Sequence, residues 1–174
     1  QSAGSGPYVL TDRPESGKPA RHGWFFSVWR RQPDGRWKVA LDVGTKGPAA
    51  AVPLRPAMLA AFPLKGSRPP RLPGPAEKET AALVARDRAS SGSKALWLSE
   101  ARLHRDGEPP IAGIVDIEKR TEGRGAFGTS PTGGGVAKSG DLGYTYGSYV
   151  AAGEKGWYAR VWKMTESGDW KLAV

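Results

Sequence analysis

The side chains able to carry out chemistry are few in this sequence, and their scarcity excludes several kinds of site. The 174 residues include no cysteine and two histidines, His22 and His104. Thiolate sites are thereby excluded, and two distant histidines do not supply the ligand set of a typical zinc site. The glycines at 133–135 lack the Lys-Ser/Thr pair that a phosphate-binding loop needs. We therefore expect neither a metal nor a cofactor.

Two aspartates lie close in the sequence to residues that assist acid–base catalysis. Asp106 follows His104 by two positions, and Asp141 stands three positions before Tyr144. An apolar site can shift the pKa of a carboxyl group into the range where it works as a general base or acid. Each aspartate is also adjacent to a glycine, which is typical of a turn. Both interpretations stay open, and the turn is the simpler one.

Arg160 places a positive charge in an aromatic stretch. Alternate side chains of an extended strand share a face, so Tyr158, Arg160 and Trp162 would lie together. A guanidinium on that face could neutralise an anionic ligand, or it could pair with a carboxylate at the surface. Aromatic side chains can also stack on nucleobases or sugars, but their period-two spacing favours core and interface positions.

Tryptophans recur at a fixed offset of 133 residues, which indicates a duplicated architecture. Three pairs share this offset: Trp24 and Trp157, Trp29 and Trp162, and Trp37 and Trp170. Residues 22–31 alternate like a strand with apolar side chains on both faces, 32–35 fit a hairpin turn, and 36–43 return as the partner strand. Such a hairpin is marginal by itself. We therefore expect Trp24, Trp29 and Trp37 to be covered at an interface.

Charge and proline content separate the first part of the chain from the rest. Residues 1–75 include 12 basic and 4 acidic residues, whereas residues 76–174 include 14 and 13. The basic residues are mostly spaced singly, so we expect a solvated surface and no nucleic-acid partner. Eight prolines between 45 and 75 predict a linker, because proline cannot donate to a β ladder and breaks helices.

Two further observations concern the compartment. No apolar run approaches the about 20 residues needed to cross a bilayer, so we expect no membrane span. The sequence begins with Gln in place of Met, which predicts a processed or truncated chain. A removed export signal is one explanation and proteolysis is another. We favour a periplasmic or secreted location over a cytoplasmic one.

Helical and strand patterns alternate after residue 75. Pro75 and the acidic residues that follow begin a helix that ends near Ser90. A glycine-rich loop is expected at 131–135. The other expected elements are a short helix at 94–99, a strand at 101–105, a helix at 111–120, and strands at 126–129, 136–139, 142–152, 157–164 and 170–174.

This order of elements, with four motifs, resembles the nuclear transport factor 2-like superfamily and its SnoaL-like and stress-type bacterial branches. The motifs lie at 103–111, 139–147, 156–162 and 168–171. The resemblance covers 76–174 and implies an α+β fold. In that fold a curved antiparallel sheet forms a cone, helices pack on its concave face, and the interior holds an apolar cavity.

The first copy departs from the family pattern. Residues 1–44 match only the closing strands and would add a partial second sheet, joined to the complete domain by the 45–75 linker. The missing helices would come from a removed amino-terminal fragment or from a neighbouring chain in a homo-oligomer. Because domains of this family pair through their sheets, we expect the sheet of 136–174 to cover the first copy.

The resemblance also implies site residues and three candidate functions. Asp141, His104 and Asp106 are the candidate catalytic residues. The candidate ligand-binding residues are Tyr144, Tyr146, Tyr158, Arg160 and Trp162, which would receive a small apolar or anionic ligand. The functions are a small-molecule-binding or assembly module, an enzyme of the cyclase, isomerase or dehydratase kind, and a structural subunit completed by a neighbouring chain.

Overall fold

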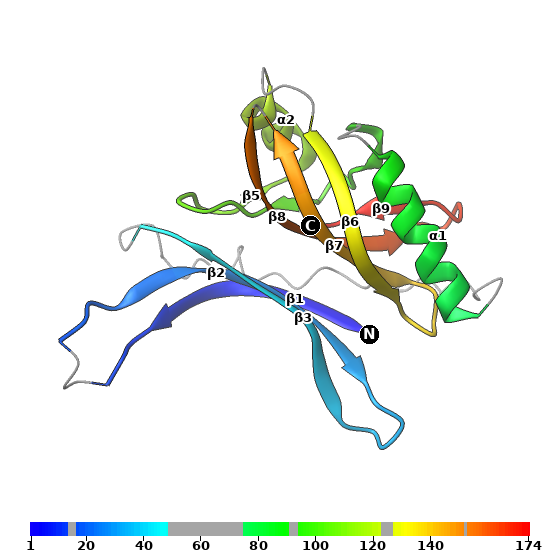
Figure 1. Ribbon diagram of the computed structural model, residues 1–174, viewed down its shortest axis with the longest axis horizontal. Coiled ribbons are helices and arrows are strands. Elements are labelled where there is room, and N and C mark those ends of the chain that lie inside the picture. Colours follow the sequence, from blue (N-terminus) through cyan, green and yellow to red (C-terminus); the bar gives the residue numbers. More distant parts are fainter. Residues whose placement is uncertain (14–16, 49–74, 91–93, 123–126, 152) are drawn as a thin grey trace. The chain divides into compact units, whose positions relative to one another are not determined.

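The computed structural model describes residues 1–13, 17–48, 75–90, 94–122, 127–151 and 153–174 (Figure 1). The predicted α+β class is confirmed, and both larger sheets are antiparallel. The chain divides into two compact units. The predicted linker, 45–75, lies outside the described residues except at its two ends.

The amino-terminal unit contains one three-stranded sheet. Its strands are β1 (Ser2–Leu10), β2 (Arg21–Arg31) and β3 (Trp37–Lys46), in that order. In β2 the alternating residues Trp24, Phe26 and Val28 are buried, as the period-two pattern requires. The predicted hairpin at 22–43 is therefore confirmed.

Residues 103–111 belong to this amino-terminal unit, although they come much later in the sequence. The His104 ring lies 5.5 Å from the Phe26 ring, centroid to centroid. The Lys46 N–H donates to Asp106 Oδ1 at 2.9 Å, and the Gly107 N–H donates to the Lys46 carbonyl at 2.9 Å. The short strands β4 (Arg102–Leu103) and β5 (Ile111–Ala112) pair where the chain leaves and re-enters the other unit.

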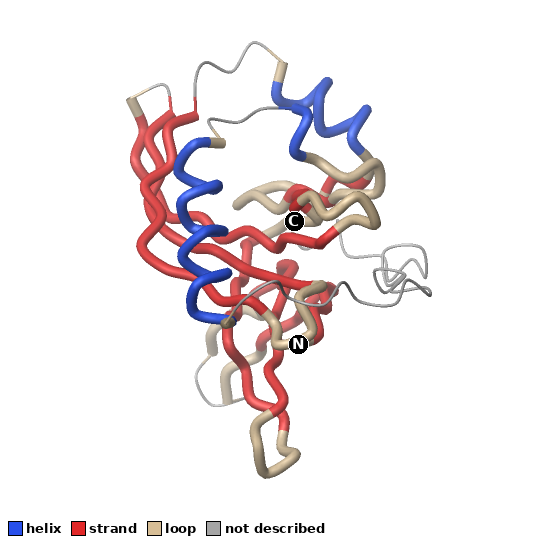
Figure 2. The backbone as a smooth tube through the Cα atoms, turned by 90° about the vertical axis from the view of Figure 1, so that its right-hand side faces the viewer, coloured by secondary structure: helices blue, strands red, loops and turns tan. Residues whose placement is uncertain are grey.

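The carboxy-terminal unit packs a helix on a four-stranded sheet. Its elements in chain order are α1 (Ala76–Ala89), η4 (Lys94–Leu96), α2 (Ile114–Thr121), β6 (Phe127–Val136), β7 (Leu142–Ala151), β8 (Glu154–Met164) and β9 (Trp170–Leu172). The sheet order is β6-β7-β8-β9. Figure 2 shows α1 running alongside the strands. The helix predicted after Pro75 is confirmed.

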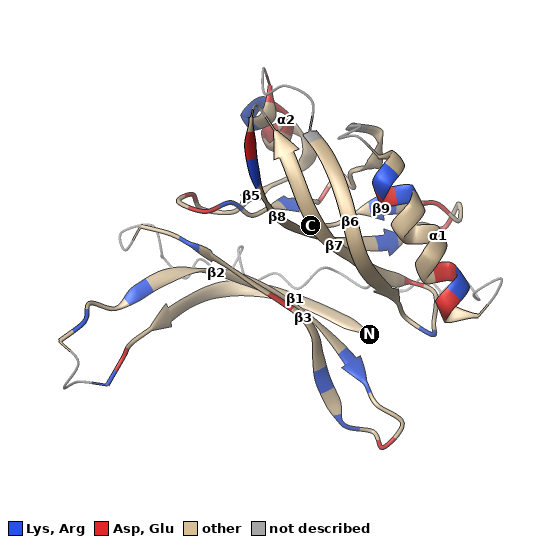
Figure 3. Ribbon diagram, viewed as in Figure 1, with Lys and Arg blue, Asp and Glu red and all other residues tan. Residues whose placement is uncertain are grey.

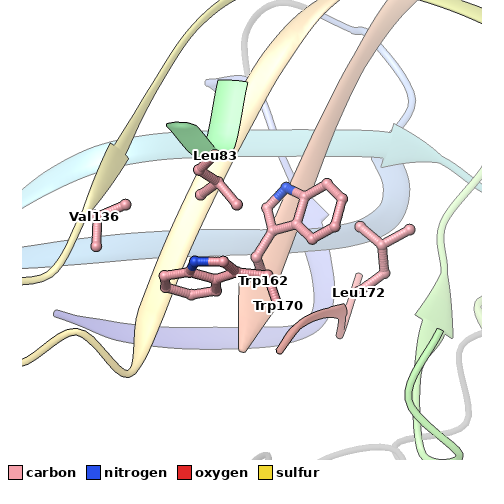
Figure 4. Packing of buried hydrophobic residues seen from close by; sticks show 5 residues of the cluster. All are labelled: Leu83, Val136, Trp162, Trp170 and Leu172. Carbon is pink, nitrogen blue, oxygen red and sulfur yellow. The ribbon is translucent and has the colours of Figure 1, made fainter. Parts of the chain in front are cut away.

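The sequence of α1 suits a helix at both ends. Glutamates occupy its first turn and arginines its last, which complements the helix dipole. Arg86 donates to the Trp170 carbonyl at 3.2 Å, and Thr80 accepts the Val136 N–H at 3.1 Å. Beneath α1 lies the core of this unit, formed by Leu83, Val136, Trp162, Trp170 and Leu172 (Figure 4).

The expected loop at 131–135 is wrong, because β6 continues through it with an irregularity between Pro131 and Gly133. A Cβ at Gly135 would stand 2.8 Å from the Tyr144 ring, and one at Gly133 would stand 2.7 Å from the Tyr146 hydroxyl. The glycines therefore make room for tyrosines of the neighbouring strand. Pro131 is tolerated because β6 is an edge strand.

The helix expected at 94–99 is also wrong, since η4 is a single 3-10 turn. The backbone beyond it turns to β9, where the Leu98 N–H donates to the Leu172 carbonyl at 2.9 Å. The Leu98 N–H thus bonds to β9, whereas in a longer helix it would bond within the helix. The strand expected at 101–105 is reduced to β4, and the helix expected at 111–120 begins later, at Ile114.

The β2–β3 and β8–β9 hairpins have the same turn at the offset of 133. The Gln32 N–H donates to the Arg36 carbonyl at 2.7 Å, and the equivalent Thr165 N–H donates to the Asp169 carbonyl at 2.9 Å. Gly35 and Gly168 adopt φ values of 82° and 85°, which favour glycine. Both turns are therefore built from the same conformation.

The two hairpins also share an irregularity in their ladders. The β2–β3 register shifts after Val28, so that Val28 faces Leu41 while Trp29 faces Val39. In the second hairpin Ala173 and Val174 both donate to the Val161 carbonyl, at 2.8 and 3.3 Å. Two residues opposite one is the pattern of a β-bulge. It falls at the same place in both hairpins.

A tyrosine lies over a glycine in both sheets as well. Tyr8 faces Gly23 across β1 and β2, and Tyr149 faces Gly156 across β7 and β8. A Cβ at either glycine would come within 2.8 Å of the tyrosine ring. Equivalence therefore extends over three strands, with β1, β2 and β3 corresponding to β7, β8 and β9.

Candidate functional site

The candidate catalytic residue Asp141 stabilises a turn. It lies between β6 and β7, after Gly140, whose φ is 79°. Its carboxylate accepts a hydrogen bond from the Ser139 hydroxyl, and its carbonyl accepts the Met164 N–H at 2.9 Å. These bonds hold the turn against β8. The turn interpretation accounts for the position of Asp141 in the structure.

The other two candidate catalytic residues, His104 and Asp106, lie in the amino-terminal unit. Asp106 is exposed, and its carboxylate accepts the Lys46 N–H described above. Asp141 belongs to the carboxy-terminal unit. The three candidates are thus divided between two units.

The five candidate ligand-binding residues lie on opposite faces of one sheet. Residues that face each other across an antiparallel pair project to the same side. Thr145 faces Arg160, whereas Tyr144 faces Val161. Tyr158, Arg160 and Trp162 therefore share the side that carries α1, and Tyr144 and Tyr146 share the other side. All five belong to the carboxy-terminal unit, and three of them share one side of its sheet.

A buried ion pair joins α1 to β8 on the helix-bearing side. Asp87 is completely buried and Arg160 nearly so, and Arg160 Nη1 donates to Asp87 Oδ1. The same nitrogen donates to Ser90 Oγ at 2.8 Å. Ser90 Oγ in turn donates to the Asp87 carbonyl at 2.6 Å. Of the two roles considered for Arg160, the structure shows an ion pair, but in the interior.

Tyr158 completes this network from the same strand. Its hydroxyl donates to Asp87 Oδ2 at 2.7 Å, and Arg160 Cζ lies 5.1 Å from the centre of its ring. Burial, followed by the hydrogen bond to Asp87, raises the pKa of Tyr158 well above its ordinary range. Tyr158 therefore remains protonated and acts as a donor.

Both carboxylate oxygens of Asp87 are occupied by partners within the protein. Oδ1 accepts from Arg160 and Oδ2 accepts from Tyr158. Removing one member of a buried ion pair leaves an uncompensated charge, which costs about 3–5 kcal/mol. The network therefore fixes α1 to β8, and this is the role that its geometry supports.

The sequence analysis did not identify Asp87, although one signal was present. Leu83 and Asp87 are four residues apart on a helix, so they share one face. A carboxylate on the face that buries a leucine requires a cation. Its partner, Arg160, is far away in the sequence and could be found only from the folded structure.

Trp162 occupies a core position. It is fully buried in the cluster beneath α1, and its Nε1 donates to Thr145 Oγ1 at 2.8 Å. A buried indole N–H usually requires such a partner. The position is that of a packing residue, with its one polar atom already bonded.

An exposed apolar surface lies on the other side of the carboxy-terminal sheet. Trp157 is 81% exposed, and Tyr146 and Val150 are exposed as well. Trp157 faces Ser148 across β7 and β8, so it stands diagonally beside both of them. We call these three residues the Trp157 face.

A second exposed apolar surface lies on the amino-terminal sheet. Trp29, Trp37 and Val39 are 41%, 50% and 49% exposed. Trp29 faces Val39 and Arg31 faces Trp37, so all four side chains project to one side of β2 and β3. We call Trp29, Trp37 and Val39 the Trp29 face. Trp24, by contrast, is buried on the opposite side, and a Cβ at Gly47 would stand 1.9 Å from its ring.

Positive charge surrounds the turn end of the Trp29 face (Figure 3). The exposed basic residues are Arg30, Arg31, Arg36 and Lys38. The acidic residue in this turn is Asp34, which pairs with Arg36 at 2.7 Å. The hydrogen bond from Arg36 lowers the pKa of Asp34, which keeps that carboxylate charged.

Comparison with known proteins found no matching family model, no matching curated protein and no matching solved structure. Among the residues with described positions, no helix has both the length and the apolar character to cross a membrane. Contacts, burial and charge within the chain are therefore the basis for inferring function.

Proposed function

We propose that this chain is an assembly module that binds other polypeptides through the exposed faces of its sheets. The observation that supports this proposal is the pair of aromatic faces, one on each sheet. They occur on equivalent sheets but on opposite sides of them, one over β2 and β3 and the other over β7 and β8. The nuclear transport factor 2-like resemblance is part of the proposal, since sheet pairing is common in that superfamily.

Exposed aromatic clusters favour association. Covering apolar surface releases about 25 cal/mol for each Å² removed from water. Contiguous exposed apolar patches on soluble proteins commonly mark interaction sites, and aromatic residues are enriched at the centres of interfaces. Trp157 is the most exposed of these side chains, so its own sheet buries little of it.

A second copy of the chain is the proposed occupant of the Trp157 face. The equivalent residue on the amino-terminal sheet is Trp24, which is buried. The same side of the duplicated hairpin is therefore suited to burial when a partner covers it. A self-complementary patch on a sheet face is also what a twofold dimer requires.

A catalytic function receives no comparable support. Asp141 bonds within a turn, Asp106 accepts the Lys46 N–H from β3, and both oxygens of Asp87 are occupied by Arg160 and Tyr158. The cyclase, isomerase or dehydratase activity stays a prediction, as does the binding of a small apolar or anionic ligand.

Sedimentation velocity tests the proposed self-association. From about 1 to about 100 µM, we expect the mean mass of the wild-type chain to rise toward that of a dimer. Trp157→Ser should abolish the rise because it removes the centre of the patch. Trp37→Ser is the matched control and should leave it unchanged. A monomeric mass for the wild-type chain over the whole range would contradict self-association through this face.

A further inference from the structure

The Trp29 face corresponds, residue by residue, to the core of the carboxy-terminal unit. Trp29, Trp37 and Val39 are equivalent to Trp162, Trp170 and Leu172, because both hairpins pair in the same register. The second set is buried beneath α1 together with Leu83. The first set is exposed. One hairpin therefore displays the surface on which the other carries a helix.

Small residues of β1 lie beside Trp29 in the amino-terminal sheet, as a small residue of β7 lies beside Trp162. In the carboxy-terminal sheet Trp162 faces Gly143, where an added Cβ would stand 2.5 Å from Leu83 Cδ2. In the amino-terminal sheet Trp29 faces Ser2, and two residues along β1 an added Cβ at Gly4 would meet no atom within 4 Å. Small residues therefore lie beside the tryptophan in both sheets. In the carboxy-terminal sheet α1 fills the space above them.

The residues that bind Asp87 in the carboxy-terminal unit are replaced in the β2–β3 hairpin. A helix on the Trp29 face must therefore lack a carboxylate at the position of Asp87. Ser27 stands at the position of Arg160, and Phe25 stands at the position of Tyr158. Ser27 already donates its hydroxyl to Asp42. A carboxylate placed like Asp87 would therefore meet no cation and no phenol. A matching helix needs an apolar residue there.

Charge adds a requirement for the rest of the helix. At the turn end of the hairpin, the exposed Arg31 projects to the same side as Trp37, and Arg36 lies in the turn, where it pairs with Asp34. Arg30 and Lys38 face each other on the opposite side. Opposite charge across an interface accelerates association and fixes its register. Acidic residues on the part of the helix nearest the turn would complement Arg31 and Arg36.

We infer that the Trp29 face is the docking site for an acidic amphipathic α-helix supplied by another polypeptide. The helix takes the place over β2 and β3 that α1 takes over β8 and β9. Its apolar stripe presents a leucine equivalent to Leu83 and an apolar residue in place of Asp87. This inference rests on the proposed assembly function but uses the sheet that the proposed self-association does not use.

The probe is a fluorescein-labelled synthetic peptide with the sequence of residues 75–90 and three changes, Lys78→Glu, Asp87→Ala and Arg88→Glu. Titrated with the full chain, its fluorescence anisotropy should report a Kd of about 10–100 µM. A peptide that retains Asp87, and one with lysine at the two charge-changed positions, should each bind at least about fivefold more weakly.

Variants of the full chain locate the site. The Trp29→Ala, Trp37→Ala double variant should weaken binding at least about tenfold, because buried aromatic anchors dominate interfaces. Val39→Lys should do the same through an independent residue. Trp157→Ala is the matched control and should bind like the wild type. Far-ultraviolet circular dichroism checks that each variant is folded.

Three results would overturn the inference. One is no binding of the peptide at about 1 mM chain. Another is equal binding by the chain with and without Trp29 and Trp37. The third is binding of that face to phosphatidylserine vesicles but not to the peptide, which would identify a membrane as the occupant. Dimerisation through Trp157 with no peptide binding would refute this inference alone, and the reverse result would refute only the self-association.

Discussion

The β2–β3 and β8–β9 hairpins share a backbone conformation but bury different tryptophans. Their turns and their bulge correspond position by position, and a tyrosine of the preceding strand lies over the same glycine position in each. Yet Trp24 is 2% exposed and its equivalent Trp157 is 81% exposed, whereas Trp29 is 41% exposed and its equivalent Trp162 is fully buried. The local sequence determines the hairpin. What covers it determines which tryptophans form the core.

The comparison also shows how the two hairpins differ beneath the helix position. On the carboxy-terminal sheet α1 supplies Leu83 to the core and Asp87 to the ion pair. Equivalent positions on the amino-terminal sheet carry a serine and a phenylalanine in place of Arg160 and Tyr158. The two hairpins therefore differ at the positions where α1 makes its polar contacts, as the proposed docking of a different helix requires.

The largest expected difference between the hairpins is in the cost of removing equivalent tryptophans. Trp162→Ala should lower the free energy of unfolding by about 3–5 kcal/mol, because it empties the centre of a packed core. Trp29→Ala should change it by about 0.5 kcal/mol, since the side chain is exposed. Urea titration followed by circular dichroism measures both. Equal losses of stability would contradict the conclusion that Trp162 is a core residue and Trp29 is not.

The ion pair should show the next largest effect. Arg160→Met leaves Asp87 buried without a cation and should cost about 3 kcal/mol. Adding Asp87→Leu should recover much of that loss, because the unpaired charge is then gone. Ser27→Ala at the equivalent position should cost about 1 kcal/mol through its lost hydrogen bond. A double variant no more stable than Arg160→Met would show that the pair is not the source of the effect.

The shared turns should respond alike. Gly35→Ala and Gly168→Ala each force a residue with a Cβ into a left-handed conformation, at a cost of about 1–2 kcal/mol. An added Cβ has no close contact at either position. The two losses in urea titration should therefore agree within error. A large loss in one hairpin alone would mean that the turns are not equivalent.

The smallest effect should come from Tyr158, whose equivalent is Phe25. Tyr158→Phe should cost about 1 kcal/mol at neutral pH by removing the hydrogen bond to Asp87. Because folding raises the pKa of Tyr158, the folded chain keeps a proton that the unfolded chain loses above about pH 10. The stabilisation is therefore complete below that pH and is lost as the pH rises above it. Urea midpoints from pH 8 to 11 should fall less steeply for Tyr158→Phe than for the wild type. Identical slopes would contradict the assignment.

Much of the fold could be predicted from the sequence because its signals are local. The alternation in 22–31, the turn glycines and the charges at the ends of α1 act over a few residues, and the elements they predict are present. The loop expected at 131–135 was wrong, because sequence alone does not distinguish a glycine that makes room for a tyrosine from a glycine in a loop. The backbone after η4 bonds to β9, which no local pattern reveals.

The candidate site was predicted less well, for a related reason. Both faces of each hairpin are apolar, so alternation could not tell which face is buried. The prediction that Trp24, Trp29 and Trp37 are all covered stays a prediction for Trp29 and Trp37, which are exposed in the structure. The partner of Arg160 lies on a distant helix, and pairing over such a separation depends on the tertiary fold.

Incorporation of 5-fluorotryptophan tests most directly whether the duplicated hairpins bury different tryptophans. Each fluorine resonance, assigned by single Trp→Phe substitutions in the monomeric chain, reports its contact with water through the shift between H₂O and D₂O. We expect clear shifts for Trp29, Trp37 and Trp157 and none for Trp24, Trp162 and Trp170. Matching shifts for Trp29 and Trp162, or for Trp24 and Trp157, would contradict the account.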